Sequence, residues 1–181
     1  MSEIPLLARV EALENERAVR QLITRYFRIC DDLGPDTPFN ELGELFTADS
    51  IWEGKGRYAK AFGRYNGRDA IVAMIRSYCL PVPHFAMTAH FLTAENISVS
   101  GSGATGEWMM LQTSDYTDGR ADLRSAHLTI HCRNDSGTWQ ISHFRTLNLF
   151  SRRVERWSDV ADIPVPQSNQ TETLALSLIH I

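Results

Sequence analysis

Residues 85–150 read FAMTAHFLTAENISVSGSGATGEWMMLQTSDYTDGRADLRSAHLTIHCRNDSGTWQISHFRTLNLF. Three short sequences in this stretch combine glycine with serine or aspartate, as tight turns do: Ser100–Gly103, Asp118-Gly119 and Asp135–Gly137. Between the turns the apolar and polar residues alternate with a period of two. The alternation predicts strands over residues 85–100, 103–116, 121–134 and 138–150. Because strands joined by such short turns must be antiparallel, we expect an antiparallel meander.

The residues before this stretch follow a helical period. Apolar side chains between residues 4 and 33 recur at helical spacing, and Gly34-Pro35 ends the predicted helix. Thr37, as an N-cap, and Pro38 predict a second, short helix, and a third is expected over Arg68–Cys79. Further predicted elements are two strands interrupted by glycines, within 51–53 and 58–65, and a short helix at 151–157. Helices followed by a meander indicate an α+β domain.

The composition fits one globular domain, expected over residues 1–158, with an extended or poorly ordered tail over 159–181. The net charge of −4 argues against nonspecific binding to nucleic acid. Three widely spaced cysteines form no recognisable zinc or disulfide framework, so we expect reduced thiols in a cytoplasmic protein. The first residues do not resemble a signal peptide, and no stretch approaches the apolar length of a membrane span.

Tyr26, Asp31 and His90 are the candidate catalytic residues. Tyr26 lies on the apolar stripe of the first helix, so its hydroxyl needs a buried partner. Asp31 lies in the last turn, where the helix dipole disfavours a carboxylate unless a partner is near. Beside an imidazole, the carboxylate of Asp31 would hold His90 in the tautomer whose outer nitrogen can accept a proton. The alternatives are that Tyr26 is a core tyrosine, Asp31 a solvated aspartate and His90 a structural histidine. Asp32, the neighbour of Asp31, is expected in solvent.

Five sequence strings, in this order, resemble the SnoaL-like branch of the NTF2-like superfamily over about residues 8–157: Val10–Glu14, Leu45–Trp52, Asn66–Ile71, Asn96–Gly106 and Asp135–Ile141. The resemblance implies a cone, in which a curved antiparallel sheet wraps around a pocket closed by three N-terminal helices. The fold hosts dehydratases, isomerases and noncatalytic proteins, so it alone does not define the reaction.

Two shorter strings resemble particular dehydratases of this superfamily. Tyr26-Phe27-Arg28 with Asp31 resembles the bile-acid 7α-dehydratase pattern, which also has a histidine near the position of His90. The pair His90-Phe91 resembles the pocket His-Phe of scytalone dehydratase. Scytalone dehydratase has a tyrosine immediately before its aspartate where this chain has Cys30, which argues against a scytalone-like substrate. The resemblance implies catalytic roles for Tyr26, Asp31 and His90.

Four further residues are candidates for binding the substrate: Thr88, Trp108, Met110 and His127. Thr88 shares a strand face with His90. Trp108 and Met110 lie on the strand that forms pocket walls in such cones, although they suit a core equally well. His127 lies at about the position of a polar pocket residue in scytalone dehydratase. It shares a face with Thr129 and His131, which could line a pocket or face solvent.

The residues and the resemblance together predict a cofactor-independent dehydratase without a metal. The enzyme would remove water from a hydroxyl β or δ to a ketone in a small, cyclic, apolar substrate that is steroid-, polyketide- or aromatic-like. His90 would take the proton, Asp31 would orient His90, and Tyr26 would donate to the enolate oxygen. The alternatives are a double-bond isomerase, and a noncatalytic protein such as a small subunit of an aromatic-ring dioxygenase or a ligand-binding cone. We expect a homo-oligomer, a trimer rather than a dimer.

Overall fold

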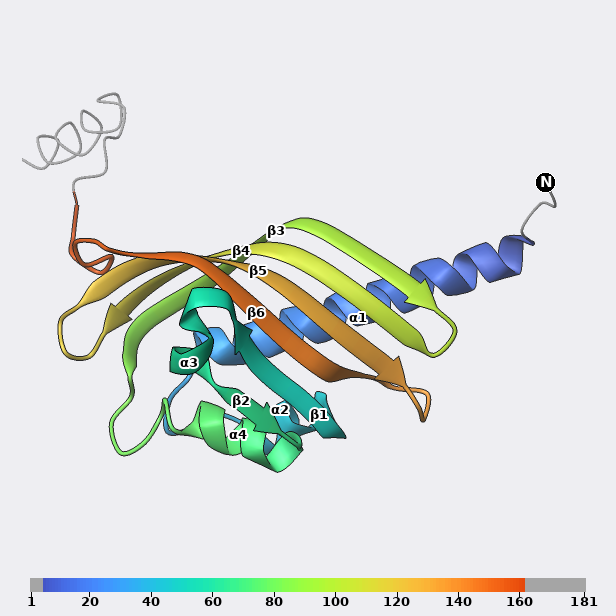
Figure 1. The fold of residues 1–181 in the computed structure, drawn as a ribbon, viewed down its shortest axis with the longest axis horizontal. Helices are drawn as coiled ribbons and strands as arrows, with labels where there is room; N and C mark the ends of the chain where they lie inside the picture. Colours follow the sequence, from blue (N-terminus) through green and yellow to red (C-terminus); the bar gives the residue numbers. More distant parts are fainter. Residues whose placement is uncertain (1–4, 162–181) are drawn as a thin grey trace, which may run out of the picture.

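The computed structural model describes residues 5–161 (Figure 1). The elements follow the order α1 (Leu6–Asp31), α2 (Phe39–Glu44), β1 (Phe46–Lys55), η1 (Gly56–Tyr58), α3 (Ala59–Phe62), β2 (Arg64–Asn66), α4 (Arg68–Arg76), β3 (Phe85–Ser100), β4 (Gly103–Tyr116), β5 (Ala121–Asn134) and β6 (Trp139–Arg153). The predicted α+β class is confirmed, and so are the four long strands. Most of the predicted tail lies outside the described residues.

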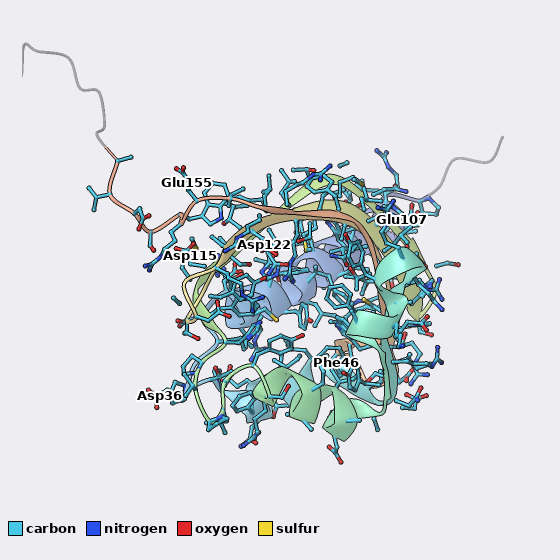
Figure 2. The ribbon with its side chains drawn as sticks, turned by 60° about the vertical axis from the view of Figure 1, so that its left-hand side comes forward. Asp36, Phe46, Glu107, Asp115, Asp122 and Glu155 are labelled. Carbon is cyan, nitrogen blue, oxygen red and sulfur yellow. The ribbon has the colours of Figure 1, made fainter. Side chains whose placement is uncertain are left out.

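The strands form one curved sheet in the order β2-β1-β6-β5-β4-β3. The meander β3 to β6 is antiparallel, as predicted, but β1 pairs with β6 in parallel, so the sheet is mixed. A parallel pair is possible here because the two strands are far apart in the sequence and no tight turn joins them. Figure 2 shows the sheet curving around α1, with α4 on the opposite side of the enclosed space.

Three local predictions were wrong. The strand expected over residues 58–65 is extended only in β2, and its first part belongs to η1 and α3, because Gly56 and Gly63, both at positive φ, turn the chain on either side of these helices. Residues 151–153 extend β6 in place of a helix, since they pair with Asp122–Arg124 of β5. Thr37 does not cap α2: its hydroxyl hydrogen-bonds the backbone of Gly34 instead.

The core forms where α1 packs into the concave face of the sheet. The buried stripe of α1 consists of Val19, Leu22, Ile23, Tyr26, Phe27 and Cys30. It faces buried side chains of the long strands, including Leu128, Ile130 and Phe144. Burying one such side chain contributes about 1.5–3 kcal/mol, so this interface holds the helix in place. All three cysteines are buried and free. No helix of the described part of the chain is long and apolar enough to cross a membrane.

Candidate active site

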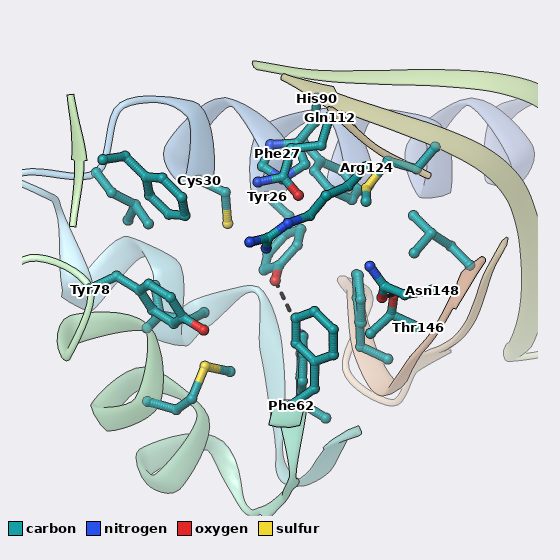
Figure 3. A pocket seen from close by; sticks show the side chains of 18 residues that line it. Tyr26, Phe27, Cys30, Phe62, Tyr78, His90, Gln112, Arg124, Thr146 and Asn148 are labelled. Atoms are coloured by element: carbon teal, nitrogen blue, oxygen red, sulfur yellow. Dashed lines mark hydrogen bonds between the residues drawn. The ribbon is translucent and has the colours of Figure 1, made fainter. Parts of the chain in front are cut away.

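A cavity of about 110 Å³ lies between α1 and the concave face of the sheet (Figure 3). Its wall is largely apolar and includes seven aromatic side chains: Tyr26, Phe27, Trp52, Phe62, Tyr78, Phe85 and Phe144. A few polar side chains interrupt this wall: His90, Gln112, Arg124, Thr146 and Asn148. An apolar cavity with a small number of placed polar groups is the usual form of a small-molecule site.

His90 and Asp31 form a hydrogen-bonded pair at the edge of this cavity. The Nδ1 atom of His90 lies 2.5 Å from Oδ1 of Asp31, and the backbone N–H of His90 donates to the same oxygen at 3.0 Å. The carboxylate therefore holds the proton on Nδ1 and leaves Nε2 as the nitrogen that can accept one. The ring of Phe27 packs against the imidazole at 5.0 Å between centroids and fixes its plane.

The end of α1 determines how Asp31 reaches His90. Asp31 is the last residue of α1, and its side chain is 33% exposed while that of His90 is 12% exposed. Asp31 is not part of the cavity wall, so it binds the imidazole on the side away from the cavity. Asp32 is exposed at the C-cap, as expected for a solvated carboxylate.

Tyr26 is buried in the cavity wall, one helical turn before Cys30. Its hydroxyl oxygen accepts a hydrogen bond from Nε1 of Trp52 at 3.3 Å, drawn as the dashed line in Figure 3. Because the oxygen acts as the acceptor, its own proton stays available to a bound molecule. Burial raises the pKa of the Tyr26 phenol well above its usual value, so the group serves as a donor and not as a base.

Cys30 also lines the cavity, but its environment argues against nucleophilic chemistry. Burial raises the pKa of its thiol to about 12. A thiol with so high a pKa stays protonated at neutral pH, and the thiolate is the nucleophilic form. Cys30 is therefore unsuited to act as a nucleophile.

A polar row crosses three neighbouring strands on the cavity side of the sheet. His90 of β3 pairs with Gln112 of β4, and Gln112 pairs with Arg124 of β5. Thr88 is not part of the wall; its hydroxyl accepts a hydrogen bond from Nε2 of Gln112 at 3.2 Å, while Ser114 accepts another at 3.1 Å. These two bonds occupy the amide nitrogen and turn the amide oxygen of Gln112 toward the cavity.

Asn148 and Met110 complete the wall on β6 and β4. Asn148 accepts a hydrogen bond from Thr146 at 3.0 Å through Oδ1, which leaves its amide nitrogen as a donor. Met110 was predicted to line the pocket and does so. Gln112, Arg124 and Asn148 were not predicted. Only Asn148 has apolar neighbours on both sides in its strand, Leu147 and Leu149, so the alternation gave a signal for this residue and little for Gln112 and Arg124.

His127 does not line the cavity. It pairs with Met109 and Leu147 on the convex face of the sheet, so the polar face of β5 points outward and Leu128 points inward. The prediction of His127 as a pocket residue is corrected, because strand alternation defines two faces without identifying the inner one.

Trp108 is on the inner face but outside the cavity wall. It is 2% exposed, and its indole nitrogen donates to Glu95 at 3.1 Å. The absence of a side chain at Gly106 makes room for its ring, since a Cβ there would lie 2.1 Å from it. Trp108 is therefore a core residue and not a pocket residue.

A second cluster of charges lies around Glu53, whose side chain is 4% exposed. Burial by itself would raise the pKa of Glu53, but hydrogen bonds from Lys55, His143, Arg145 and Arg64 lower it to about 2. The cluster cross-links β1, β2 and β6 and holds Trp52, the preceding residue, in the cavity wall.

The same fold occurs in solved structures of several lyases. A hexachlorocyclohexane dehydrochlorinase, LinA-type3 of Novosphingobium barchaimii, is 16% identical with a TM-score of 0.66, and the match covers 86% of this chain and 99% of that chain. A candidate scytalone dehydratase of Novosphingobium aromaticivorans is 17% identical with a TM-score of 0.65, covering 82% and 97%.

An NTF2-like protein with a cystatin-like fold, also from Novosphingobium aromaticivorans, is 25% identical with a TM-score of 0.62 and covers 80% of this chain and 88% of that chain. No curated protein sequence matches the chain. The model of the SnoaL-like domain matches residues 11–145, from the second turn of α1 into β6. The chain therefore belongs to the SnoaL-like domain family and has the NTF2-like fold.

Proposed function

We propose that the protein is a cofactor-independent lyase that removes water from a hydroxyl β or δ to a ketone in a small cyclic substrate. The observation that carries this proposal is the His90–Asp31 pair at the edge of an apolar cavity. An imidazole held in one tautomer by a carboxylate is suited to proton transfer, and an apolar cavity that excludes water strengthens its interactions with charge.

The proposed reaction begins with proton abstraction by Nε2 of His90 from the carbon next to the carbonyl. Electrons of the broken C–H bond move to the carbonyl oxygen, which becomes an enolate, and Tyr26 donates a hydrogen bond to it. The imidazolium, stabilised by Asp31, then returns its proton to the leaving hydroxyl. Water departs, the C=C bond forms and the ketone is restored. Each positioned acid or base of this kind contributes about 10²–10⁴-fold to the rate.

The dimensions of the cavity favour a substrate with one ring. A volume of about 110 Å³ is close to that of the cavity of ~150 Å³ known to bind benzene in an engineered protein. Among the predicted steroid-, polyketide- and aromatic-like substrates, an aromatic-like substrate therefore fits best.

Without a leaving group the same residues would move a double bond, which makes isomerisation the alternative reaction. A noncatalytic small subunit of a dioxygenase, or a ligand-binding cone, would not need the pair.

The experiment uses 3-hydroxycyclohexanone and cyclohex-3-enone as probes for dehydration and isomerisation. Both reactions form the conjugated enone, whose ultraviolet absorbance reports the rate. We expect wild-type turnover with 3-hydroxycyclohexanone, and at least a ~10²-fold loss in His90→Ala. The control is His127→Ala, which removes an imidazole from the convex face and should keep the rate within about twofold.

Two outcomes would contradict the proposal. Turnover of cyclohex-3-enone without turnover of the hydroxyketone would identify an isomerase. If wild type and His90→Ala are equally inactive, including in exchange of the α-protons of cyclohexanone in D₂O followed by NMR, proton abstraction by His90 is refuted.

The predicted homotrimer also remains a proposal. Phe91, Leu111 and Leu147 are 53%, 42% and 37% exposed on the convex face of the sheet, around His127. Light scattering after size-exclusion chromatography would measure the mass, and Leu111→Asp should reduce it if this face joins the copies.

A further inference from the structure

Arg124 is a charged side chain inside an otherwise apolar and neutral-polar wall. It is the one Lys, Arg, Asp or Glu among the described residues that line the cavity, and Figure 3 shows it extending from β5 into that space. Its side chain is 23% exposed. A guanidinium in such surroundings is costly unless its donors find acceptors, so its hydrogen bonds indicate what it is placed to bind.

The protein supplies acceptors for only part of the guanidinium. Nε donates to Oδ2 of Asp122 at 2.7 Å, and Nη2 donates to the hydroxyl of Tyr116. In the described part of the chain, Nη1 has no protein acceptor. The charge of Asp122 is itself shared, because the same Oδ2 accepts from Tyr116 at 3.0 Å and from Ser151 at 3.1 Å. Asp122 and Tyr116 thus orient the guanidinium of Arg124, while its Nη1 edge faces the cavity.

We propose that Arg124 binds a carboxylate of the substrate, so that the ring bound beside His90 is a cyclic carboxylic acid. This inference rests on the proposed function for its placement of the reacting carbon at His90. A carboxylate is the natural partner, because a guanidinium offers parallel N–H donors that match its two oxygens.

The sheet register places the two ends of this substrate. His90, Gln112 and Arg124 occupy one row on three adjacent strands. Strands lie about 4.8 Å apart, so the backbones of His90 and Arg124 are separated by roughly 10 Å. The side chains of His90 and Arg124 take up part of this distance and leave room for one ring between them. The carboxylate of the ring would lie at Arg124 and its acidic carbon at His90. Asp31 lies behind His90, at the far end of the row, and so does not oppose an anion at Arg124.

The test measures equilibrium binding by isothermal titration calorimetry, with cyclohexanecarboxylate and cyclohexanecarboxamide as probes. The two molecules share one ring and nearly one shape, but only the first is an anion. We expect the wild type to bind the carboxylate at least ~10-fold more tightly. Arg124→Gln should reduce this preference to within about twofold, mainly by weakening the binding of the carboxylate.

Three further variants make the result specific. Arg120→Gln removes an exposed cation that also lies against Tyr116, outside the cavity wall, and should keep the preference. His90→Ala should keep it too, which separates anion binding from catalysis and excludes the imidazole as the anion site. If Arg124→Gln fails to fold because Asp122 loses its partner, the double variant Asp122→Asn/Arg124→Gln provides an uncharged pair.

The inference is overturned if the wild type does not discriminate between the probes, if Arg124→Gln retains the preference, or if His90→Ala loses it. The proposed lyase activity is measured separately with neutral 3-hydroxycyclohexanone. A lyase that binds both probes equally would therefore refute the carboxylate site alone, and a carboxylate-selective protein without turnover would refute the lyase alone.

Discussion

Replacing Tyr26 by phenylalanine separates the catalytic and structural interpretations of this residue. The change deletes one oxygen and keeps the ring, which packs edge-on against Phe27 and Phe46 at centroid distances of 5.1 and 5.7 Å. The hydroxyl has two possible uses. It accepts a hydrogen bond from Trp52, and its proton is available to an enolate oxygen in the cavity.

The structural cost follows from the hydrogen bond to Trp52. Loss of the acceptor leaves the indole N–H of a residue that is 8% exposed without a partner. An unsatisfied buried donor costs about 1–3 kcal/mol, and the bond length of 3.3 Å favours the lower end. For a domain of this size, a loss of about 1 kcal/mol lowers Tm by roughly 2–4 °C.

The catalytic cost is larger if the hydroxyl stabilises the enolate. The bond strengthens as charge develops, so kcat should fall by roughly 10–10³-fold with little change in KM. Thermal unfolding and kcat are measured on the same samples of wild type, Tyr26→Phe and Trp52→Phe. Trp52→Phe removes the same hydrogen bond from its donor side and should lose stability while keeping most of its kcat.

The interpretation is refuted if Tyr26→Phe loses stability and keeps the wild-type kcat. In that case Tyr26 is a core tyrosine whose hydroxyl only satisfies Trp52. Equal losses of kcat in both variants would also refute it, because they would trace the defect to packing of the cavity wall and not to the phenol.

Two further variants test the carboxylates of the chain. Asp31→Asn can still accept both hydrogen bonds from His90 but cannot stabilise an imidazolium, so kcat should fall at least ~10²-fold. In the control, the exposed Asp32→Asn, kcat should stay within about twofold of the wild-type value. The reverse result would assign the role to Asp32. Glu53 has its pKa lowered from 4.5 to about 2 in the folded protein. Its ionised form thus contributes about 3 kcal/mol of stability, fully present above pH ~4.5 and lost as pH falls toward 2. Urea unfolding should show Glu53→Gln destabilised at pH 7 and less than half as much at pH 3; an equal loss at both would contradict this.

The sequence by itself determined the elements of the fold that depend on local patterns. The turns at Gly101, Gly119 and Gly137 are at positive φ, and the long strands begin and end within a few residues of their predicted bounds. Helical periodicity identified α1 and its buried stripe. These features were predictable because turn chemistry and the spacing of apolar residues act between near neighbours.

The candidate site depended on the same patterns only in part. Tyr26, His90 and Met110 were predicted at the pocket and lie in its wall, while the catalytic roles of Tyr26, Asp31 and His90 stay predictions. The contact between Asp31 and His90 joins residues 59 positions apart, so the resemblance suggested it and only the structure shows it.

Tertiary structure alone decided which face of each strand is the inner one. Arg124 and His127 lie three positions apart on β5, so alternation puts them on opposite faces, but it does not say that Arg124 faces the cavity and His127 the convex side. The pairing of β5 with β6 skips Leu149 of β6, between the pairs Ala126–Asn148 and Ser125–Phe150. This bulge shifts the alternation of β6 beyond Asn148, whereas the pairing of β5 with β4 is continuous, so β5 keeps its period of two. The orientation of a strand is set by the neighbours it pairs with and the helix it packs against, and neither is encoded within the strand itself.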